Sequence, residues 1–120
     1  MKTIYVSHSH KMNYEGELYR PLLNSKISDI YKLILPHSNE YDEVDTKDIL
    51  INSDYLIAEV SYSGTGIGLE LGRAECNNIP IICIIKSGIK CSSSVKRNFD
   101  IIEYSGEDDM VSKLEKLLLN

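Results

Sequence analysis

Two apolar runs and the segment between them constrain the fold of this chain most strongly. Residues 55–60 (YLIAEV) and 80–85 (PIICII) show no regular alternation of apolar and polar side chains. Strands of this kind are buried on both faces, as in a parallel sheet that is covered by helices. The segment between them carries Gly64, Gly66 and Gly68, followed by Glu70 at the start of a helical pattern. The sequence therefore predicts a strand, a glycine-rich turn, a helix and a second strand in succession.

The remaining segments alternate between strand and helix in the same way. Further strands are predicted at residues 3–7, 31–35 and 101–104. Helices are predicted at 14–24 (broken or kinked by Pro21), 44–52, 66–77 and 110–119. This order is typical of an α/β fold, here a Rossmann- or flavodoxin-like open sheet of about five mainly parallel strands with helices on both faces. Without a repeat or linker-like stretch, residues 1–120 are expected to form a single domain.

Composition excludes several classes of protein. The net charge of −5, with no basic cluster larger than a pair such as Lys96 and Arg97, argues against non-specific nucleic-acid binding. No apolar run is long enough to cross a bilayer, so we expect a cytoplasmic protein without a membrane partner. The cysteines are odd in number and lack metal-ligand spacing. They are expected to be thiols, and neither a metal nor a redox cofactor is expected.

Polar loops follow the first three predicted strands, at residues 7–11, 36–39 and 61–68. Open α/β sheets bind ligands at the carboxyl ends of their strands, where the strand order reverses. Glu70 comes shortly after the third loop, near a helix N-terminus, where exposed N–H groups favour anions. A carboxylate in that place can stabilise or attack an electron-poor carbon. The alternative is a glutamate that only caps a strand-to-helix turn.

The segments SDYLIAEV, GTGIGLELGRA and IPIICII, within residues 53–86, resemble the core of the nucleoside 2-deoxyribosyltransferase superfamily. The likeness is greatest to its branch of 2'-deoxynucleoside 5'-monophosphate N-glycosidases. In this superfamily the glutamate of an ELG motif is the catalytic nucleophile, and the matching residue here is Glu70, before Leu71 and Gly72. The resemblance also places Tyr5, on the first strand, beside that nucleophile.

The same resemblance implies a set of substrate-binding residues. The loop after the first strand would hold a phosphate through hydroxyls, imidazoles and Lys11, although SHSH replaces the family's glycine-containing loop. A polar surface loop is the alternative. A further serine would be donated across a dimer interface, although a run of three serines is also ordinary loop composition. The expected substrate-binding residues are Ser7, His8, Ser9, Lys11, His37, Ser63, Gly64, Gly66 and Ser92.

The family also uses an aspartate on the helix before the third strand. Counting back from Asp54 without a gap gives Thr46, with Asp45 and Asp48 on either side. We favour Asp48 as the second catalytic acid, which would protonate the leaving base or position the acceptor. Asp54 itself is expected to orient the entry into the third strand.

Together these residues predict cleavage of an N-glycosidic bond in a nucleoside or nucleoside 5'-monophosphate through a glutamate nucleophile. Water or a second base would accept the sugar, so both hydrolase and transferase stay open, as do the base, the sugar and the need for a phosphate. The resemblance further implies a homodimer. One alternative is an NAD glycohydrolase of the Toll/interleukin-receptor type, because IYVSHSHK resembles the first strand and loop of those domains. Another is a non-catalytic nucleotide-binding module.

Overall fold

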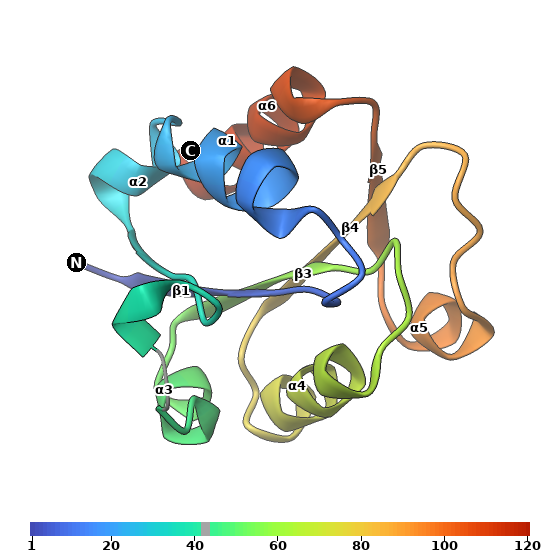
Figure 1. Ribbon diagram of the computed structural model, residues 1–120, viewed down its shortest axis with the longest axis horizontal. Coiled ribbons are helices and arrows are strands. Elements are labelled where there is room, and N and C mark those ends of the chain that lie inside the picture. Colours follow the sequence, from blue (N-terminus) through green and yellow to red (C-terminus); the bar gives the residue numbers. More distant parts are fainter. Residues whose placement is uncertain (42–43) are drawn as a thin grey trace.

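Five parallel strands form the centre of the molecule (Figure 1). The computed structural model describes residues 1–41 and 44–120. The sheet has the order β2-β1-β3-β4-β5, and every neighbouring pair is parallel. The predicted α/β fold with a parallel sheet is therefore confirmed. Its strands are β1 (Thr3–Ser7), β2 (Lys32–Ile34), β3 (Tyr55–Glu59), β4 (Ile81–Lys86) and β5 (Ile101–Tyr104).

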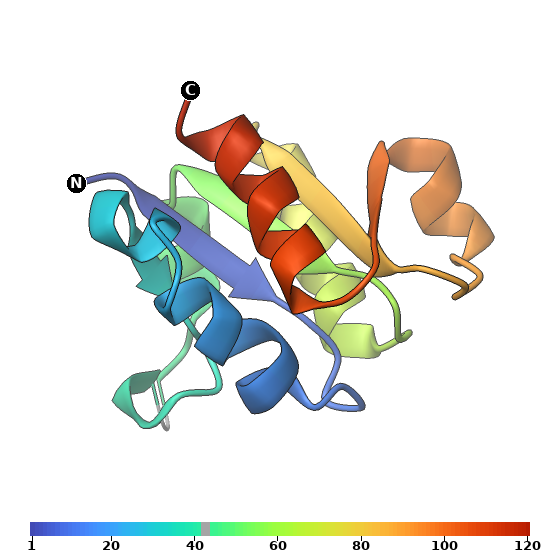
Figure 2. The ribbon, with the colours of Figure 1, turned by 90° about the horizontal axis from the view of Figure 1, so that it is seen from above.

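Helices cover both faces of the sheet. Figure 2 shows one face, which is covered by η1 (Glu15–Tyr19), α1 (Arg20–Leu23), α2 (Ile27–Ile30) and α6 (Glu107–Leu118). The other face carries α3 (Lys47–Ile51), α4 (Thr65–Cys76) and α5 (Ser93–Asn98), and the short 3-10 helix η2 (Asn39–Tyr41) follows β2. None of the helices in the described ranges is long and apolar enough to cross a membrane.

Strand β3 shows why its residues do not alternate in polarity. The Ile57 side chain packs in the cluster under α1 and α6, whereas Leu56 and Ala58 pack in the cluster under α3 and α4. All three side chains are fully buried. Burying each large aliphatic side chain contributes about 1.5–3 kcal/mol. Both faces of the strand therefore demand apolar residues.

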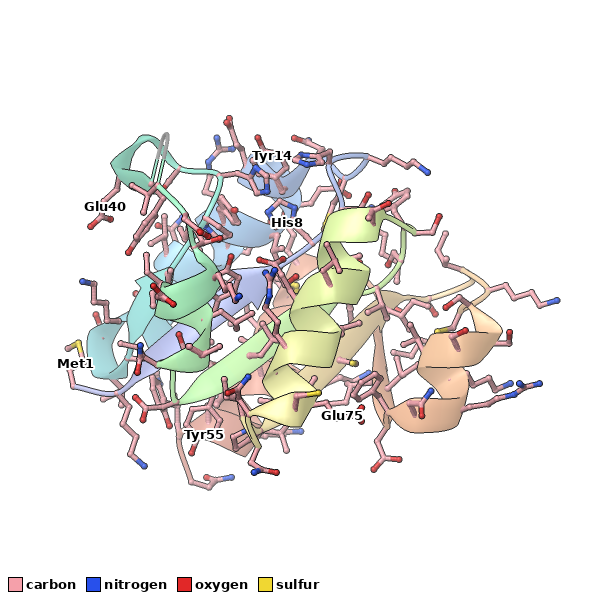
Figure 3. All side chains as sticks on the ribbon, turned by 90° about the horizontal axis from the view of Figure 1, so that it is seen from below. Met1, His8, Tyr14, Glu40, Tyr55 and Glu75 are labelled. Atoms are coloured by element: carbon pink, nitrogen blue, oxygen red, sulfur yellow. The ribbon has the colours of Figure 1, made fainter. Side chains whose placement is uncertain are left out.

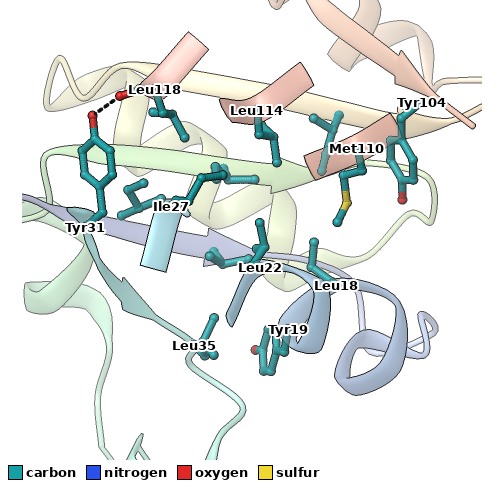
Figure 4. Packing of buried hydrophobic residues seen from close by; sticks show 14 of the residues in the cluster. Leu18, Tyr19, Leu22, Ile27, Tyr31, Leu35, Tyr104, Met110, Leu114 and Leu118 are labelled. Carbon is teal, nitrogen blue, oxygen red and sulfur yellow. Dashed lines mark hydrogen bonds between the residues drawn. The ribbon is translucent and has the colours of Figure 1, made fainter. Parts of the chain in front are cut away.

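The first cluster is drawn in Figure 4, where α6 packs on η1, α1 and α2. Leu114 and Leu118 of α6 face Leu22 and Ile27 across this layer. The Tyr31 hydroxyl donates a 2.7 Å hydrogen bond to the Leu118 carbonyl oxygen and so joins the end of α6 to the start of β2. This layer supports β1 from the side opposite to α3 and α4.

Local details differ from the sequence prediction at two helices. Instead of a break at Pro21, a π-helical turn (η1) runs directly into α1, and Pro21 occupies the first turn of α1. Proline has no N–H to donate to the carbonyl four residues earlier, and the wider π turn precedes that position. The serine run was expected to be a loop, but Ser92 is the N-cap of α5 and its Oγ accepts from the Val95 N–H at 3.4 Å.

The entry into β3 agrees with the prediction for Asp54. Its Oδ2 accepts the Thr3 N–H at 2.8 Å and thereby ties the start of β3 to the start of β1. Because β1 lies between β2 and β3, the strand order reverses beside β1. The carboxyl ends of β1 and β3 are thus the place where a fold of this type binds its ligand.

Candidate active site

Glu70 lies on α4 with its carboxylate directed at β1. Its Oε1 accepts a 2.6 Å hydrogen bond from the Ser7 hydroxyl, and its Oε2 accepts a hydrogen bond from the Tyr5 hydroxyl. Tyr5 and Ser7 are two residues apart on β1, so they point to the same face of the sheet, toward α4. Both are fully buried, while Glu70 is half-buried. The structure therefore holds both carboxylate oxygens in a fixed orientation at the strand ends.

The Tyr5 hydroxyl acts as a proton donor to this carboxylate. Burial raises the pKa of Tyr5 well above its ordinary value, and the hydrogen bond to Glu70 raises it further. An interaction with the Thr46 side chain opposes this rise only in part. Tyr5 therefore stays protonated at neutral pH and can keep donating to Glu70.

Of the three candidates on the helix before β3, Thr46 is the one that reaches the site. Its side chain interacts with the Tyr5 hydroxyl. The Asp45 Oδ1 instead accepts the Lys47 N–H at 3.0 Å, at the start of α3. Asp48, which the sequence favoured, is exposed on α3, and within the described residues no hydrogen bond joins its carboxylate to Tyr5 or Glu70. The gap-free count gave the residue that this structure brings to Tyr5.

The loop after β1 is mostly buried. It is therefore not the polar surface loop that the sequence left open as an alternative to a phosphate-binding loop. The His8 side chain is only 4% exposed and Ser9 only 5%. The Ser9 hydroxyl donates to the Ser63 carbonyl oxygen at 3.2 Å and accepts the Lys11 N–H at 3.2 Å. Ser9 thus joins this loop to the glycine-rich turn before α4, whereas the Lys11 side chain is exposed at the rim.

His8 is held as a neutral imidazole. Its Nδ1 lies 3.0 Å from the Ser9 carbonyl oxygen, which can only accept, so Nδ1 carries the proton. Its Nε2 then accepts a 2.7 Å hydrogen bond from the Tyr19 hydroxyl. Burial lowers the pKa of His8 to about 4, with weaker contributions from neighbouring groups. The same Tyr19 hydroxyl accepts the His37 N–H at 3.1 Å, so it links the loops that follow β1 and β2.

His8 belongs to a cluster of five rings, which are those of His8, His10, Tyr14, Tyr19 and His37. The His8 ring stacks on Tyr14 with centroids 4.5 Å apart and lies 4.9 Å from the His37 ring. His10 meets His37 edge-on at 4.6 Å. Figure 3 shows His8 and Tyr14 at the end of the molecule where α4 begins, whereas Tyr55 and Glu75 lie at the opposite end. Tyr14 and Tyr19 were missed by sequence reasoning, because only the apolar face of the segment 14–24 signalled them and not their contact with histidine.

The remaining candidates line a groove beside the N-terminus of α4. Ser63, Gly64 and Ser92 border a cavity of about 400 Å³, together with Lys90. Gly64 lies close to the first loop, because a Cβ atom there would come within 3.3 Å of the Ser9 Oγ. Gly66 does not line this cavity: it is the second residue of α4, and a Cβ atom there would meet open space. The structure thus places Ser92 near Ser63 of its own chain, where the resemblance implied donation across a dimer interface.

A second buried carboxylate was not predicted. Glu59 is 1% exposed and ends β3 on the face opposite to Glu70. Its Oε1 accepts the Ser61 N–H at 2.6 Å, and its Oε2 accepts the hydroxyls of Ser61, at 2.9 Å, and Tyr104. The Ser61 hydroxyl in turn accepts the Lys86 N–H at 2.8 Å. Glu59 therefore anchors the start of the glycine-rich turn to β4 and β5, and its only sequence signal was an acid within an apolar strand.

The described part of the chain contains no candidate metal site. No group of three or more His, Cys, Asp or Glu side chains within residues 1–41 and 44–120 is placed to hold a metal ion. Cys76, Cys83 and Cys91 are free thiols.

Known proteins with similar sequences share one name. The chain is 41% identical over 54 residues to "Putative 2'-deoxynucleoside 5'-phosphate N-hydrolase 1" of Methanosarcina mazei, covering 45% of this chain and 34% of the relative. It is 32% identical over 84 residues to the protein of that name from Thermofilum pendens, covering 63% and 59% of the two chains. The matched stretches thus span about a third to three-fifths of these curated relatives. No protein-family model matches the chain.

Solved structures confirm the fold. The CMP N-glycosidase BcmB of Clostridium botulinum superposes with a TM-score of 0.75 over 98% of this chain and 100% of that one, at 17% identity. A conserved protein from Enterococcus faecalis superposes with a TM-score of 0.65 over 98% and 99% of the two chains, at 14% identity. The relatives confirm the resemblance to the 2'-deoxynucleoside 5'-monophosphate N-glycosidases that residues 53–86 indicated, and they favour it over the Toll/interleukin-receptor alternative.

Proposed function

We propose that this chain cleaves the N-glycosidic bond of a nucleoside 5'-monophosphate, with Glu70 as the nucleophile. The observation that carries the proposal is the half-buried Glu70 carboxylate, which Tyr5 and Ser7 hold at the strand ends where such a fold binds ligands. The names of the similar proteins support the same chemistry. They differ in the sugar, since the curated relatives are named for 2'-deoxynucleotides and the structural neighbour for CMP.

The geometry suits a two-step reaction. As the bond from C1' to the base breaks, positive charge develops on the sugar ring, and an ionised Glu70 stabilises it. The carboxylate then forms an ester to C1', and water or another base releases the sugar from the enzyme. The hydroxyls of Tyr5 and Ser7 fix the carboxylate before substrate arrives, so little reorganisation is needed during the reaction. Hydrolysis is the outcome if water reaches C1'.

The groove beside α4 is our candidate for the phosphate subsite. Ser63 and Ser92 offer hydroxyl donors there, and Lys90 adds a positive charge. The N-terminus of the twelve-residue helix α4 adds free N–H groups. His8 and Ser9, in contrast, act by holding the loops in place, since their polar atoms already bond to protein groups. The exposed Lys11, in the loop after β1, remains a candidate contact to phosphate.

The test is a chromatographic assay for released free base. The panel contains ribo- and deoxyribonucleosides, their 5'-monophosphates and NAD, each incubated with wild type, Glu70→Gln and Glu75→Gln. Glu75 is an exposed residue of the same helix and serves as the matched control. We expect base release from a 5'-monophosphate that Glu70→Gln lowers by several powers of ten and Glu75→Gln leaves unchanged.

Other outcomes have a clear meaning. Nicotinamide release from NAD would restore the Toll/interleukin-receptor alternative. A folded wild-type protein that binds nucleotides without releasing base would be a binding module. The cytoplasmic location and the homodimer stay predictions. Sedimentation at several protein concentrations would check the dimer.

A further inference from the structure

Cleavage of a nucleotide requires a proton as well as a nucleophile. A nucleobase that leaves as an anion is a poor leaving group, so an acid must protonate it as the bond to C1' breaks. Glu70 cannot be this acid, because its ionised carboxylate is the proposed nucleophile. The acid has to lie at the same carboxyl end of the sheet as Glu70, and it has to carry a proton that it can donate to the base.

Most polar groups near Glu70 do not meet these conditions. The hydroxyl protons of Tyr5 and Ser7 are used in the hydrogen bonds to Glu70, and Thr46 is only a hydroxyl. His8 has both ring nitrogens occupied in a buried site. The carboxylate of Asp45 accepts a backbone N–H at the start of α3, and Asp48 is exposed on that helix.

His37 has the required position. It lies in the turn after β2, and its ring is 4.9 Å from the ring of His8, which directly follows the Ser7 that bonds to Glu70. The main chain of His37 is fixed there by its N–H bond to the Tyr19 hydroxyl. Its ring is only partly buried, and within the described side chains no hydrogen bond occupies either ring nitrogen. Its imidazole is therefore free to meet a ligand at this end of the sheet.

The charge environment of His37 involves both neighbouring loops and α4. Burial lowers the pKa of His37, and His10 lowers it further, while the negative charge of Glu70 acts in the opposite direction. A lowered pKa makes the imidazolium a stronger acid, but it also means that only a minor fraction of His37 carries the proton at pH 7, so this acid is more available as the pH falls. The described titratable groups around the ring are His8, His10, Tyr14, Tyr19 and Glu70.

We propose that His37 is the catalytic acid that protonates the departing base, in place of a carboxylate from α3. This inference rests on the proposed function. In the first step the imidazolium gives its proton to a ring nitrogen or oxygen of the base, the electrons of the C1'–N bond go to the base, and Glu70 forms the ester to C1'. In the second step the neutral imidazole takes a proton from the attacking water, and Glu70 is released. The sum is nucleotide plus water to base plus sugar phosphate.

The experiment compares two leaving groups on the same enzyme. One is the nucleotide that wild type cleaves. The other is its derivative whose base leaves without a proton, 7-methylguanine for a purine site or 5-nitrouracil for a pyrimidine site. Wild type, His37→Asn, His10→Asn and Glu70→Gln are assayed on both, and folding is checked by thermal unfolding. We expect His37→Asn to lose about 10²- to 10³-fold in kcat/KM on the ordinary nucleotide and less than about tenfold on the activated one.

A pH profile gives a second reading. In wild type, kcat/KM for the ordinary nucleotide should fall as the pH rises through the pKa of His37, and this fall should vanish with the activated nucleotide. Equal losses of His37→Asn on both substrates, or the same fall with both, would overturn the role of His37. His10→Asn is the matched control, and any effect of it should be equal on the two substrates. Wild type that cleaves neither nucleotide, with Glu70→Gln indistinguishable from it, would instead refute the proposed function.

Discussion

Two tyrosines of this protein donate a hydroxyl to a glutamate, and their comparison separates catalysis from stability. Tyr5 donates to Glu70, which is half-buried at the candidate active site. Tyr104 donates to Glu59, which is 1% exposed on the opposite face of the sheet. Substitution by phenylalanine removes one hydroxyl in each case and keeps the buried ring. We expect Tyr5→Phe to lower activity and Tyr104→Phe to lower stability.

The magnitudes follow from the surroundings of each carboxylate. A hydrogen bond to a charged group contributes about 1.5–3 kcal/mol. For Tyr5→Phe water can reach the half-buried Glu70, so the free energy of unfolding should change by less than about 1 kcal/mol. If the bond orients Glu70 in the transition state, the same 1.5–3 kcal/mol lowers kcat/KM about 10- to 100-fold. For Tyr104→Phe no water replaces the hydroxyl, so the full 1.5–3 kcal/mol is lost from stability.

The assays are base release for activity and urea unfolding for stability, both at pH 7. Tyr104→Phe should also lower the melting temperature by about 5–18 °C, given roughly 3–6 °C per kcal/mol for a chain of this size. Its kcat/KM should stay within about threefold of wild type. If Tyr5→Phe destabilised the fold as much as Tyr104→Phe and left kcat/KM unchanged, then the Tyr5–Glu70 bond would be structural and our reasoning about the site would be wrong.

Three further substitutions test other parts of the structure. Because burial lowers the pKa of His8 to about 4 from 6.5, the unfolded chain binds a proton that the folded chain excludes. Stability should therefore be complete above pH 6.5 and fall by about 3 kcal/mol toward pH 4, and urea unfolding of His8→Asn should show a flatter dependence over this interval. Ser92→Ala removes the N-cap of α5 and should lower the free energy of unfolding by about 0.5–1 kcal/mol. If the groove holds the phosphate, the same substitution should raise KM for a 5'-monophosphate but not for a nucleoside. In Gly66→Ala the added methyl group on α4 meets open space, so the free energy of unfolding should rise by up to about 1 kcal/mol. The melting temperature should rise with it, and a lower melting temperature would contradict this prediction.

Much of the fold follows from local patterns in the sequence. The apolar runs of β3 and β4 indicate burial on both faces, as in a parallel sheet between two helical layers. The bounds of β1 and β5 agree with the predicted 3–7 and 101–104. The helix α5 was not predicted, because it has only six residues and begins with Ser93 and Ser94, which gives too weak a pattern. The π turn η1 depends on how a proline fits into a packed layer, which no local rule specifies.

The strand–turn–helix unit, with Glu70 near the start of α4, could be read from the sequence alone, because glycine spacing and apolar runs are local properties of the chain. The resemblance also placed Tyr5 beside Glu70, but the other groups around its carboxylate could be identified only from the folded structure. The register of β1 brings Tyr5 and Ser7 to its carboxylate, and the start of α3 brings Thr46 rather than Asp48. The loops after β1 and β2 bring together His8, Tyr19 and His37 from three separate segments. Contacts of this kind depend on packing between distant segments, and a single sequence carries no local signal for them.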